Sequence, residues 1–158
     1  MPEFTAFASV SLRAIAPEDS AFLLTLYKSS RGDDLRGLGW DEERISEFLD
    51  MQYEAQQRFH TSEYKKAIDQ IVLRGNDAVG RVTFEPREHE IRCVEVALLP
   101  GHRNAGIGTR LIRELQTEAK KQKKPLRLQV IRFSRSVSLF ERLGFQRISE
   151  TGDRKSVV

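Results

Sequence analysis

The sequence has little sulfur and no long apolar run. One cysteine, Cys93, occurs in 158 residues, which excludes a disulfide within the chain and is typical of a reducing compartment. A membrane-spanning helix needs about 18 or more apolar residues in succession, and no segment has them. The first residues also lack the basic and then apolar segments of a secretory signal. We therefore expect a cytoplasmic protein with no membrane span.

The residue patterns of several kinds of active site are also missing. The three histidines, His60, His89 and His102, are not spaced with the cysteine as metal ligands are. No Gly-x-Ser-x-Gly segment is present, which argues against a serine hydrolase with a nucleophile elbow. We expect no bound metal.

Charge is unevenly distributed in a chain of ordinary globular composition. Hydrophobic residues make up 39% and charged residues 31%, so we expect a single domain over residues 1–158. The net charge is +3, but the charged residues of 33–54 are mostly acidic and those of 103–127 mostly basic. These segments are either solvated helix faces or surfaces that attract a cationic acceptor and an anionic cofactor. Because no aromatic residue interrupts the basic run Lys120–Lys124, we expect no nucleic-acid partner.

The stretch from Val94 to Leu115 predicts a strand, a glycine-containing loop and a helix. An apolar, β-branched run ends at Pro100. Beyond the loop the apolar residues recur at helical spacing: Ile107, Leu111, Ile112, Leu115 and Ala119. Gly106 and Gly108 lack a Cβ, so the backbone in front of this helix can approach a ligand closely. The N–H groups and the dipole at a helix N-terminus favour a phosphate there.

Two common phosphate-binding motifs do not match this loop. Gly101 and Gly106 have the spacing of a Walker A loop, but Ile107 and Gly108 stand where lysine and serine or threonine are required. A dinucleotide fingerprint needs Gly-x-Gly-x-x-Gly early in a βαβ unit, whereas this loop comes late and lacks the third glycine. Nucleotide triphosphates and dinucleotides are therefore disfavoured as ligands.

Along the whole chain, strand and helix patterns succeed one another. We expect strands at 9–15, 71–73, 79–84, 91–99, 126–131 and 145–149. We expect helices at 17–30, 107–123 and 134–143, a further helix that follows Asp41 and ends near residues 60–64, and a loop over 31–40. Asp41 is expected to cap the second helix and Phe59 to lie on its apolar side. This order predicts an α/β (α+β) fold with a mixed sheet and helices on both faces.

The tail Thr151–Val158 is short and polar for a closing strand. Either the last strand is truncated or a partner completes the sheet edge, so a homodimer is one expectation.

Two motifs resemble the GNAT superfamily of acyl-CoA-dependent N-acetyltransferases. The loop reads Arg103-x-x-Gly106-x-Gly108, and residues 139–145 read Leu-Phe-Glu-Arg-Leu-Gly-Phe. The resemblance covers nearly the whole chain and implies a mixed, mostly antiparallel sheet flanked by helices. It also implies that acetyl-CoA is the co-substrate, without a metal. The acetyl group would pass directly, in a ternary complex, to a primary amine on a small molecule or a protein.

The same resemblance assigns residues to the cofactor. The main chain of Leu98 and Leu99 would lie beside the pantetheine arm, and the thioester carbonyl would be polarised near Leu98. The N–H groups of the loop would surround the pyrophosphate. The loop residues concerned are Arg103, Asn104, Ala105, Gly106, Ile107, Gly108 and Thr109.

Glu95 is the candidate general base. It is the one charged residue in the apolar run 94–99, and a buried carboxylate needs a reason. The family often has a glutamate on this strand that deprotonates the acceptor through water. A strand period of two places Glu95 on the face of Cys93 and Ala97, where it would instead pair with an arginine or meet solvent. The sequence favours neither interpretation.

The sequence differs from the family at two positions near the expected leaving thiolate of coenzyme A. The position of the family's tyrosine acid is Phe140, and an asparagine that contacts the pantetheine region falls at or beside Ser134. Since a thiol with a pKa near 8.5 is a fair leaving group, we expect catalysis to survive, with solvent or a serine hydroxyl such as Ser134 as the proton source. The alternative is a non-catalytic acyl-CoA-binding module that retains the cofactor loop.

Overall fold

The computed structural model describes residues 10–103, 105–131, 140–151 and 154–157. The strands are β1 (Val10–Ala14), β2 (Ile68–Arg74), β3 (Asp77–Pro86), β4 (Ile91–Leu98), β5 (Leu126–Ile131), β6 (Arg147–Thr151) and β7 (Arg154–Val157). The α-helices with assigned bounds are α1 (Ser20–Gly37), α2 (Glu42–Glu63) and α3 (Ile107–Lys121), and the short 3₁₀ turns are η1 (Pro17–Asp19) and η2 (Pro100–His102).

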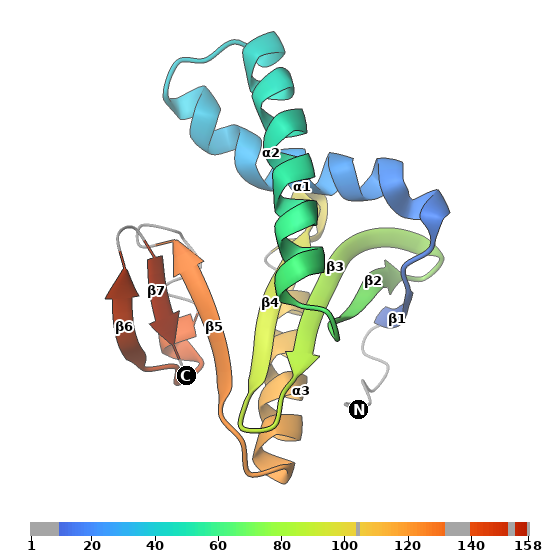
Figure 1. Cartoon of the computed structure of the whole chain (residues 1–158). Coiled ribbons are helices and arrows are strands. Elements are labelled where there is room, and N and C mark those ends of the chain that lie inside the picture. Colours follow the sequence, from blue (N-terminus) through green and yellow to red (C-terminus); the bar gives the residue numbers. More distant parts are fainter. Residues whose placement is uncertain (1–9, 104, 132–139, 152–153, 158) are drawn as a thin grey trace.

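The strands form one seven-stranded sheet in the order β1-β2-β3-β4-β5-β7-β6. All neighbours are antiparallel except β4 and β5, which are parallel because α3 crosses over between them. These two strands pair only from Ile91 with Leu126 to Cys93 with Leu128, and then diverge (Figure 1). The expected mixed, mostly antiparallel sheet is confirmed, and it splays open beside the second half of β4.

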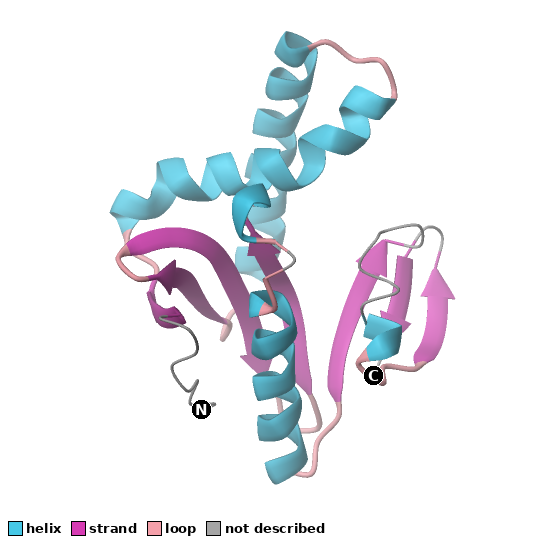
Figure 2. Cartoon of the chain, turned by 180° about the vertical axis from the view of Figure 1, so that it is seen from behind, coloured by secondary structure: helices cyan, strands magenta, loops and turns pink. Residues whose placement is uncertain are grey.

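Helices cover both faces of the sheet, as the sequence predicts. Helix α3 lies on one face, and α1 and α2 lie on the other (Figures 1 and 2). The predicted apolar stripe of α3 is confirmed, since Ile107, Leu111, Ile112, Leu115 and Ala119 are all at most 3% exposed. The stripe packs against buried side chains of the central strands, among them Val82 and Phe84. This core fixes the N-terminus of α3 next to the end of β4.

The first two helices form a long hairpin with its own small apolar cluster. The loop expected over 31–40 is mostly wrong, because α1 continues to Gly37. Leu35, near the end of that extension, packs with Trp40 against the cluster of Tyr27, Ile45 and Leu49, and this contact outweighs the poor helix propensity of glycine. Within the described residues, no helix is long and apolar enough to cross a membrane.

Helix α2 begins where the sequence predicts but buries less of its surface than expected. The carboxylate of Asp41 accepts a hydrogen bond of 2.8 Å from the Arg44 N–H, which confirms the cap. Phe59 is 58% exposed, so its expected place on the buried side is wrong. Its ring contacts those of His60 and Tyr64 at the surface instead of the sheet.

The C-terminal strand was missed by the sequence patterns. Residues Arg154–Val157 form β7, which lies between β5 and β6 and pairs with both. The tail is polar, but main-chain pairing on two sides does not depend on apolar side chains. The truncated last strand is therefore a wrong expectation, and β6 forms that edge of the sheet. The homodimer stays a prediction, but a truncated last strand no longer supports it.

Candidate active site

A bulge in β4 decides where Glu95 points. Along β3 and β4, Thr83 is opposite Glu95 and Phe84 is opposite Cys93, so Val94 is an extra residue without a partner on β3. Since Thr83 and Phe84 face opposite sides of the sheet, Glu95 and Cys93 do too. The predicted common face of Glu95 and Cys93 is wrong, because the bulge breaks the period of two.

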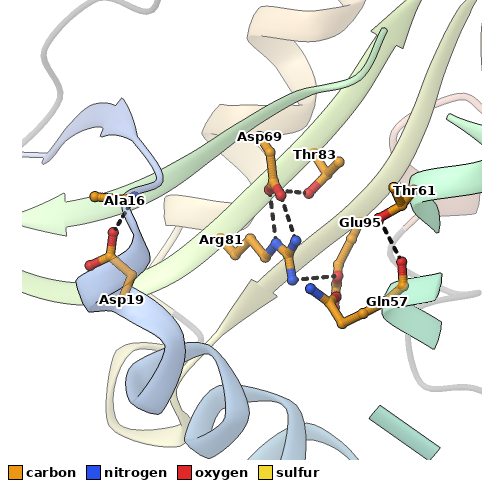
Figure 3. A network of polar contacts seen from close by, with 8 residues as sticks. All are labelled: Ala16, Asp19, Gln57, Thr61, Asp69, Arg81, Thr83 and Glu95. Atoms are coloured by element: carbon orange, nitrogen blue, oxygen red, sulfur yellow. Dashed lines mark hydrogen bonds and ion pairs between the residues drawn. The ribbon is translucent and has the colours of Figure 1, made fainter. Parts of the chain in front are cut away.

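On its face of the sheet, Glu95 joins a polar group from β2 and β3 (Figure 3). Arg81 Nε donates a 2.8 Å hydrogen bond to Oδ1 of Asp69, and Arg81 Nη2 donates to Oδ2 of the same carboxylate. The Thr83 hydroxyl donates to Oδ1 of Asp69 at 2.6 Å. Arg81 Nη1 lies 3.9 Å from Oε2 of Glu95. Glu95 therefore has an arginine neighbour, but at the outer limit of an ion pair.

The helices close over this polar group. Tyr27 of α1 and Tyr53 of α2 meet edge to face with ring centroids 5.2 Å apart, and Arg31 stands 4.7 Å above the ring of Tyr27. The Glu95 carboxylate lies close enough to both tyrosines to help raise the pKa of their hydroxyls. Aromatic groups of the two helices therefore lie near Glu95.

The burial of Glu95 changes its acid–base properties. Burial raises the pKa of the Glu95 carboxyl above its ordinary value, while the positive charges of Arg81 and Arg31 oppose that rise and the carboxylate of Asp69 adds to it. The Glu95 side chain is 18% exposed. A partly accessible carboxylate with a raised pKa suits a proton acceptor at neutral pH.

The predicted glycine loop leads from β4 through η2 into α3. Gly106 is the N-cap of α3 and has φ 82°, a left-handed conformation that favours glycine. A Cβ on Gly108 would lie 3.8 Å from Cδ1 of Leu98, so this glycine faces the end of β4. The helix therefore presents its first N–H groups next to the strand that carries Glu95. Asn104 lies outside the described residues.

The main-chain N–H and carbonyl groups at the end of β4 point in two directions. Leu99 N–H donates to the Val79 carbonyl at 2.8 Å, and the Leu99 carbonyl accepts from His102 N–H at 2.9 Å. Both groups of Leu99 that were predicted to face the pantetheine arm are thus engaged within the protein. Because alternate residues of a strand point to opposite neighbours, the main chain of Leu98 faces the splayed side, where its carbonyl accepts from Arg103 Nε at 3.0 Å.

Phe140, which the sequence predicts at the position of the family's tyrosine, is held by core contacts. Its ring lies edge-on to that of Phe145 with centroids 5.5 Å apart, and it packs against the core beneath α3. Gln116 of α3 donates a 3.0 Å hydrogen bond to the carbonyl of Leu143 in the following turn. Ser134 lies outside the described residues.

Asp69, Arg81 and Thr83 are the residues of this site that sequence reasoning missed. Arg81 interrupts the apolar strand Val79–Phe84 as Glu95 interrupts the next one, and this was the available signal. The link to Asp69 could not be read, because it depends on the register of β2 against β3. In the described part of the chain, no group of three or more His, Cys, Asp or Glu side chains is arranged to hold a metal ion.

The comparisons with known proteins agree with this architecture. Residues 67–147, about half of the chain, match the sequence model of the acetyltransferase (GNAT) domain. The chain belongs to this family. The comparison with curated protein sequences gives no match.

Solved structures share the fold at low sequence identity. The PaiA N-acetyltransferase of Thermoplasma acidophilum, in complex with coenzyme A, superposes with a TM-score of 0.73 at 19% identity, over 94% of this chain and 97% of that one. Arabidopsis thaliana Naa50, in complex with the bisubstrate analogue CoA-Ac-MVNAL, gives 0.59 at 17%, over 94% and 97%. The ribosomal-protein-S18-alanine N-acetyltransferase of Escherichia coli gives 0.61 at 14%, over 94% and 90%.

Proposed function

We propose that this protein transfers the acetyl group of acetyl-CoA to a primary amine within a ternary complex, with Glu95 as the general base. The observation that carries the proposal is the placement of a partly accessible carboxylate of raised pKa on the strand that leads into the glycine loop of a GNAT domain. An amine with a pKa near 10.4 must lose a proton before it can attack, and a buried base supplies that step.

The cofactor would bind along the end of β4 and the start of α3. The N–H groups near Gly106, Ile107, Gly108 and Thr109 would hold the pyrophosphate, with help from the helix dipole. The Leu98 N–H, which faces the splayed side of β4, would bind the thioester carbonyl and polarise it. We leave Leu99 out of the contact set, because both of its main-chain groups already have partners.

The reaction needs one bond to form and one to break. Glu95 first takes a proton from the ammonium, directly or through one water molecule, and passes it to solvent. The neutral nitrogen then attacks the thioester carbonyl carbon, and its second proton passes to Glu95 as the amide forms. Collapse of the tetrahedral intermediate breaks the carbon–sulfur bond and releases the thiolate of coenzyme A. The ring of Phe140 has no proton to give, so the thiolate would take one from solvent or from a serine hydroxyl such as Ser134.

The class of acceptor is to be identified by testing both small amines and peptides as substrates. Two of the similar structures bear names that mention a peptide-containing bisubstrate analogue or a ribosomal protein, and these support including peptides with free N-termini. The assay incubates the protein with acetyl-CoA and each amine, and follows both thiol release and the mass of the acetylated product. Glu95→Gln is the matched variant, expected to lower kcat/KM by about 10²–10⁴-fold with unchanged affinity for coenzyme A.

A second candidate is the acyl-CoA-binding module without chemistry, which the phenylalanine at position 140 favours. Binding of coenzyme A in calorimetry with no thiol release on any amine would support this module and contradict the transferase.

A further inference from the structure

The three guanidinium nitrogens of Arg81 have different partners. Nε and Nη2 are bound to Asp69, and Nη1 is the guanidinium nitrogen that faces Glu95, at 3.9 Å. The side chain of Arg81 is only 8% exposed. The Thr83 hydroxyl donates a 2.6 Å hydrogen bond to Asp69 Oδ1, the oxygen that also accepts from Arg81 Nε, and so helps to hold the carboxylate. The guanidinium therefore forms two hydrogen bonds with Asp69 but does not reach hydrogen-bonding distance of Glu95.

A buried ion pair is not in general required for stability. Desolvating an arginine and a carboxylate is unfavourable, and apolar residues of similar volume often stabilise a core at least as well. The rest of β3 from Val79 to Phe84 is largely apolar and buried. A charged pair retained in the middle of this strand points to a task beyond packing.

We propose that Arg81 and Asp69 set the charge of Glu95: Arg81 keeps the buried carboxylate ionised, and Asp69 holds Arg81 away from a full ion pair that would weaken the base. The inference rests on the proposed role of Glu95 as the base. Arg81 and Asp69 are positioning residues in this scheme, since neither is required to touch the reacting atoms.

The distance between Arg81 and Glu95 keeps the Glu95 carboxylate ionised and still leaves it basic enough to accept a proton. An opposite charge within about 4–6 Å favours the ionised form of a carboxyl by one to three pKa units. A direct, charge-assisted hydrogen bond at about 2.7–2.9 Å would favour it much more and leave a carboxylate too weak to take a proton. Because Asp69 binds two of the nitrogens of Arg81, closing the remaining distance would break existing hydrogen bonds.

Other titratable or charged groups lie near Glu95. Helix α1 contributes Arg31 and Tyr27 and helix α2 contributes Tyr53, on the same face of the sheet, whereas Cys93 lies on the opposite face of β4. Of these, Arg31 opposes the rise in the pKa of Glu95, and Glu95 in turn helps to raise the pKa of both tyrosines and of the cysteine. Arg31, Tyr27 and Cys93 keep their surroundings in all the variants below, whereas Tyr53 also hydrogen-bonds with Arg81 and loses that partner in Arg81→Met.

The test uses two variants with opposite expected signs. Arg81→Met removes the positive charge and is expected to raise the pKa of Glu95 by about one unit or more. Asp69→Asn keeps the shape, removes a negative charge and releases Arg81 toward Glu95, so it is expected to lower that pKa. Arg81→Lys keeps the charge and is expected to restore a value near that of the native protein. Thr83→Ser keeps the hydroxyl and is the control with no expected shift.

Two measurements report the pKa of Glu95 in the whole 158-residue chain. Carbon-13 NMR of the glutamate carboxyl resonances, with Glu95 assigned from Glu95→Gln, follows the titration without any substrate. The acid limb of kcat/KM against pH follows the same group during turnover. If Arg81→Met fails to fold, Asp69→Asn decides: a lowered pKa of Glu95 supports the inference, and an unchanged or raised pKa overturns it. A loss of activity alone is not counted, because structural damage would also produce it.

The outcomes separate this inference from the proposed function. Opposite shifts in the two charge variants support it. Equal or same-sign shifts overturn it, even if acetyl transfer proceeds normally. If no amine is acetylated but the NMR midpoints move in opposite directions, the transferase proposal fails while the control of Glu95 by Arg81 and Asp69 stands.

Discussion

Cys93 and Glu95 lie on opposite faces of the sheet although only Val94 separates them on β4. Cys93 belongs to the core beneath α3, whereas Glu95 lies in the polar group with Arg81. Burial and the nearby Glu95 raise the pKa of the Cys93 thiol to about 12. One strand thus carries an inert thiol on one side and a candidate base on the other.

The first prediction concerns this thiol. Because Cys93 is 5% exposed and protonated, we expect no reaction with an aromatic disulfide reagent at neutral pH until the protein is unfolded, when one thiol should appear. Cys93→Ala should retain kcat within about tenfold, since direct transfer needs no acyl-cysteine intermediate. Rapid labelling of the folded protein, together with loss of transfer in Cys93→Ala, would contradict direct transfer.

The second prediction concerns the cost of burying Glu95. A carboxyl whose pKa is raised on folding contributes stability below its ordinary pKa of 4.5, and that contribution is lost as the pH rises through the folded value. Glu95→Gln imitates the protonated form, so we expect a higher free energy of unfolding than the native protein at pH 7, and a difference that vanishes at about pH 4. Urea unfolding at both pH values measures this, with exposed Glu47→Gln as control. A less stable Glu95→Gln at pH 7 would contradict the raised pKa.

The third prediction concerns Asp19, at the start of α1. Its carboxylate accepts hydrogen bonds of 2.8 Å from the Ala16 N–H and from two nitrogens of Arg13, and these contacts lower its pKa to about 2 from the usual 3.8. Stability from a lowered pKa is present above the usual value and is lost as the pH falls through about 2. Asp19→Asn should therefore lower Tm most at neutral pH and least near the acid end. The exposed neighbour Glu18→Gln is the control, and an equal loss in both variants would contradict the assignment.

The fourth prediction concerns the close approach of β3 and β4. A Cβ on Gly80 would overlap the Ala97 carbonyl oxygen and lie 2.6 Å from Cδ2 of Leu98. We expect Gly80→Ala to destabilise the fold by about 1–3 kcal/mol, because the clash is with backbone that cannot move freely. Gly101→Ala is the matched control, since a Cβ there meets nothing within 4 Å. Equal unfolding midpoints in urea for the two variants would show that β4 adjusts at no cost.

The fifth prediction concerns Phe140. Its ring packs against Phe145 and the core, so a hydroxyl added in Phe140→Tyr would have to find room beside existing contacts. We expect kcat to change by less than about tenfold, because the thiolate of coenzyme A leaves without strong help from an acid. A rise of about a hundredfold would contradict the view that the site is adapted to phenylalanine. Coenzyme A affinity, measured in parallel, separates an effect on binding from one on chemistry.

Local patterns were sufficient for much of the fold. The spacing of apolar residues in α3 and the cap at Asp41 depend on neighbours within a few residues, and both were predicted correctly. The glycine at position 106 was likewise expected where the backbone turns into the helix, and its φ is positive. The extension of α1 and the strand β7 were missed, because each depends on partners distant in sequence.

The sequence by itself determined that this chain has a strand, a glycine loop and a helix of the GNAT kind, with one acidic residue in the strand. Only the tertiary structure decided which way that residue points and what surrounds it. The bulge at Val94 turns Glu95 away from Cys93, and the register of β2 against β3 brings Asp69 to Arg81. Both depend on pairing between strands, and a one-residue change in that pairing moves a side chain to the other face of the sheet.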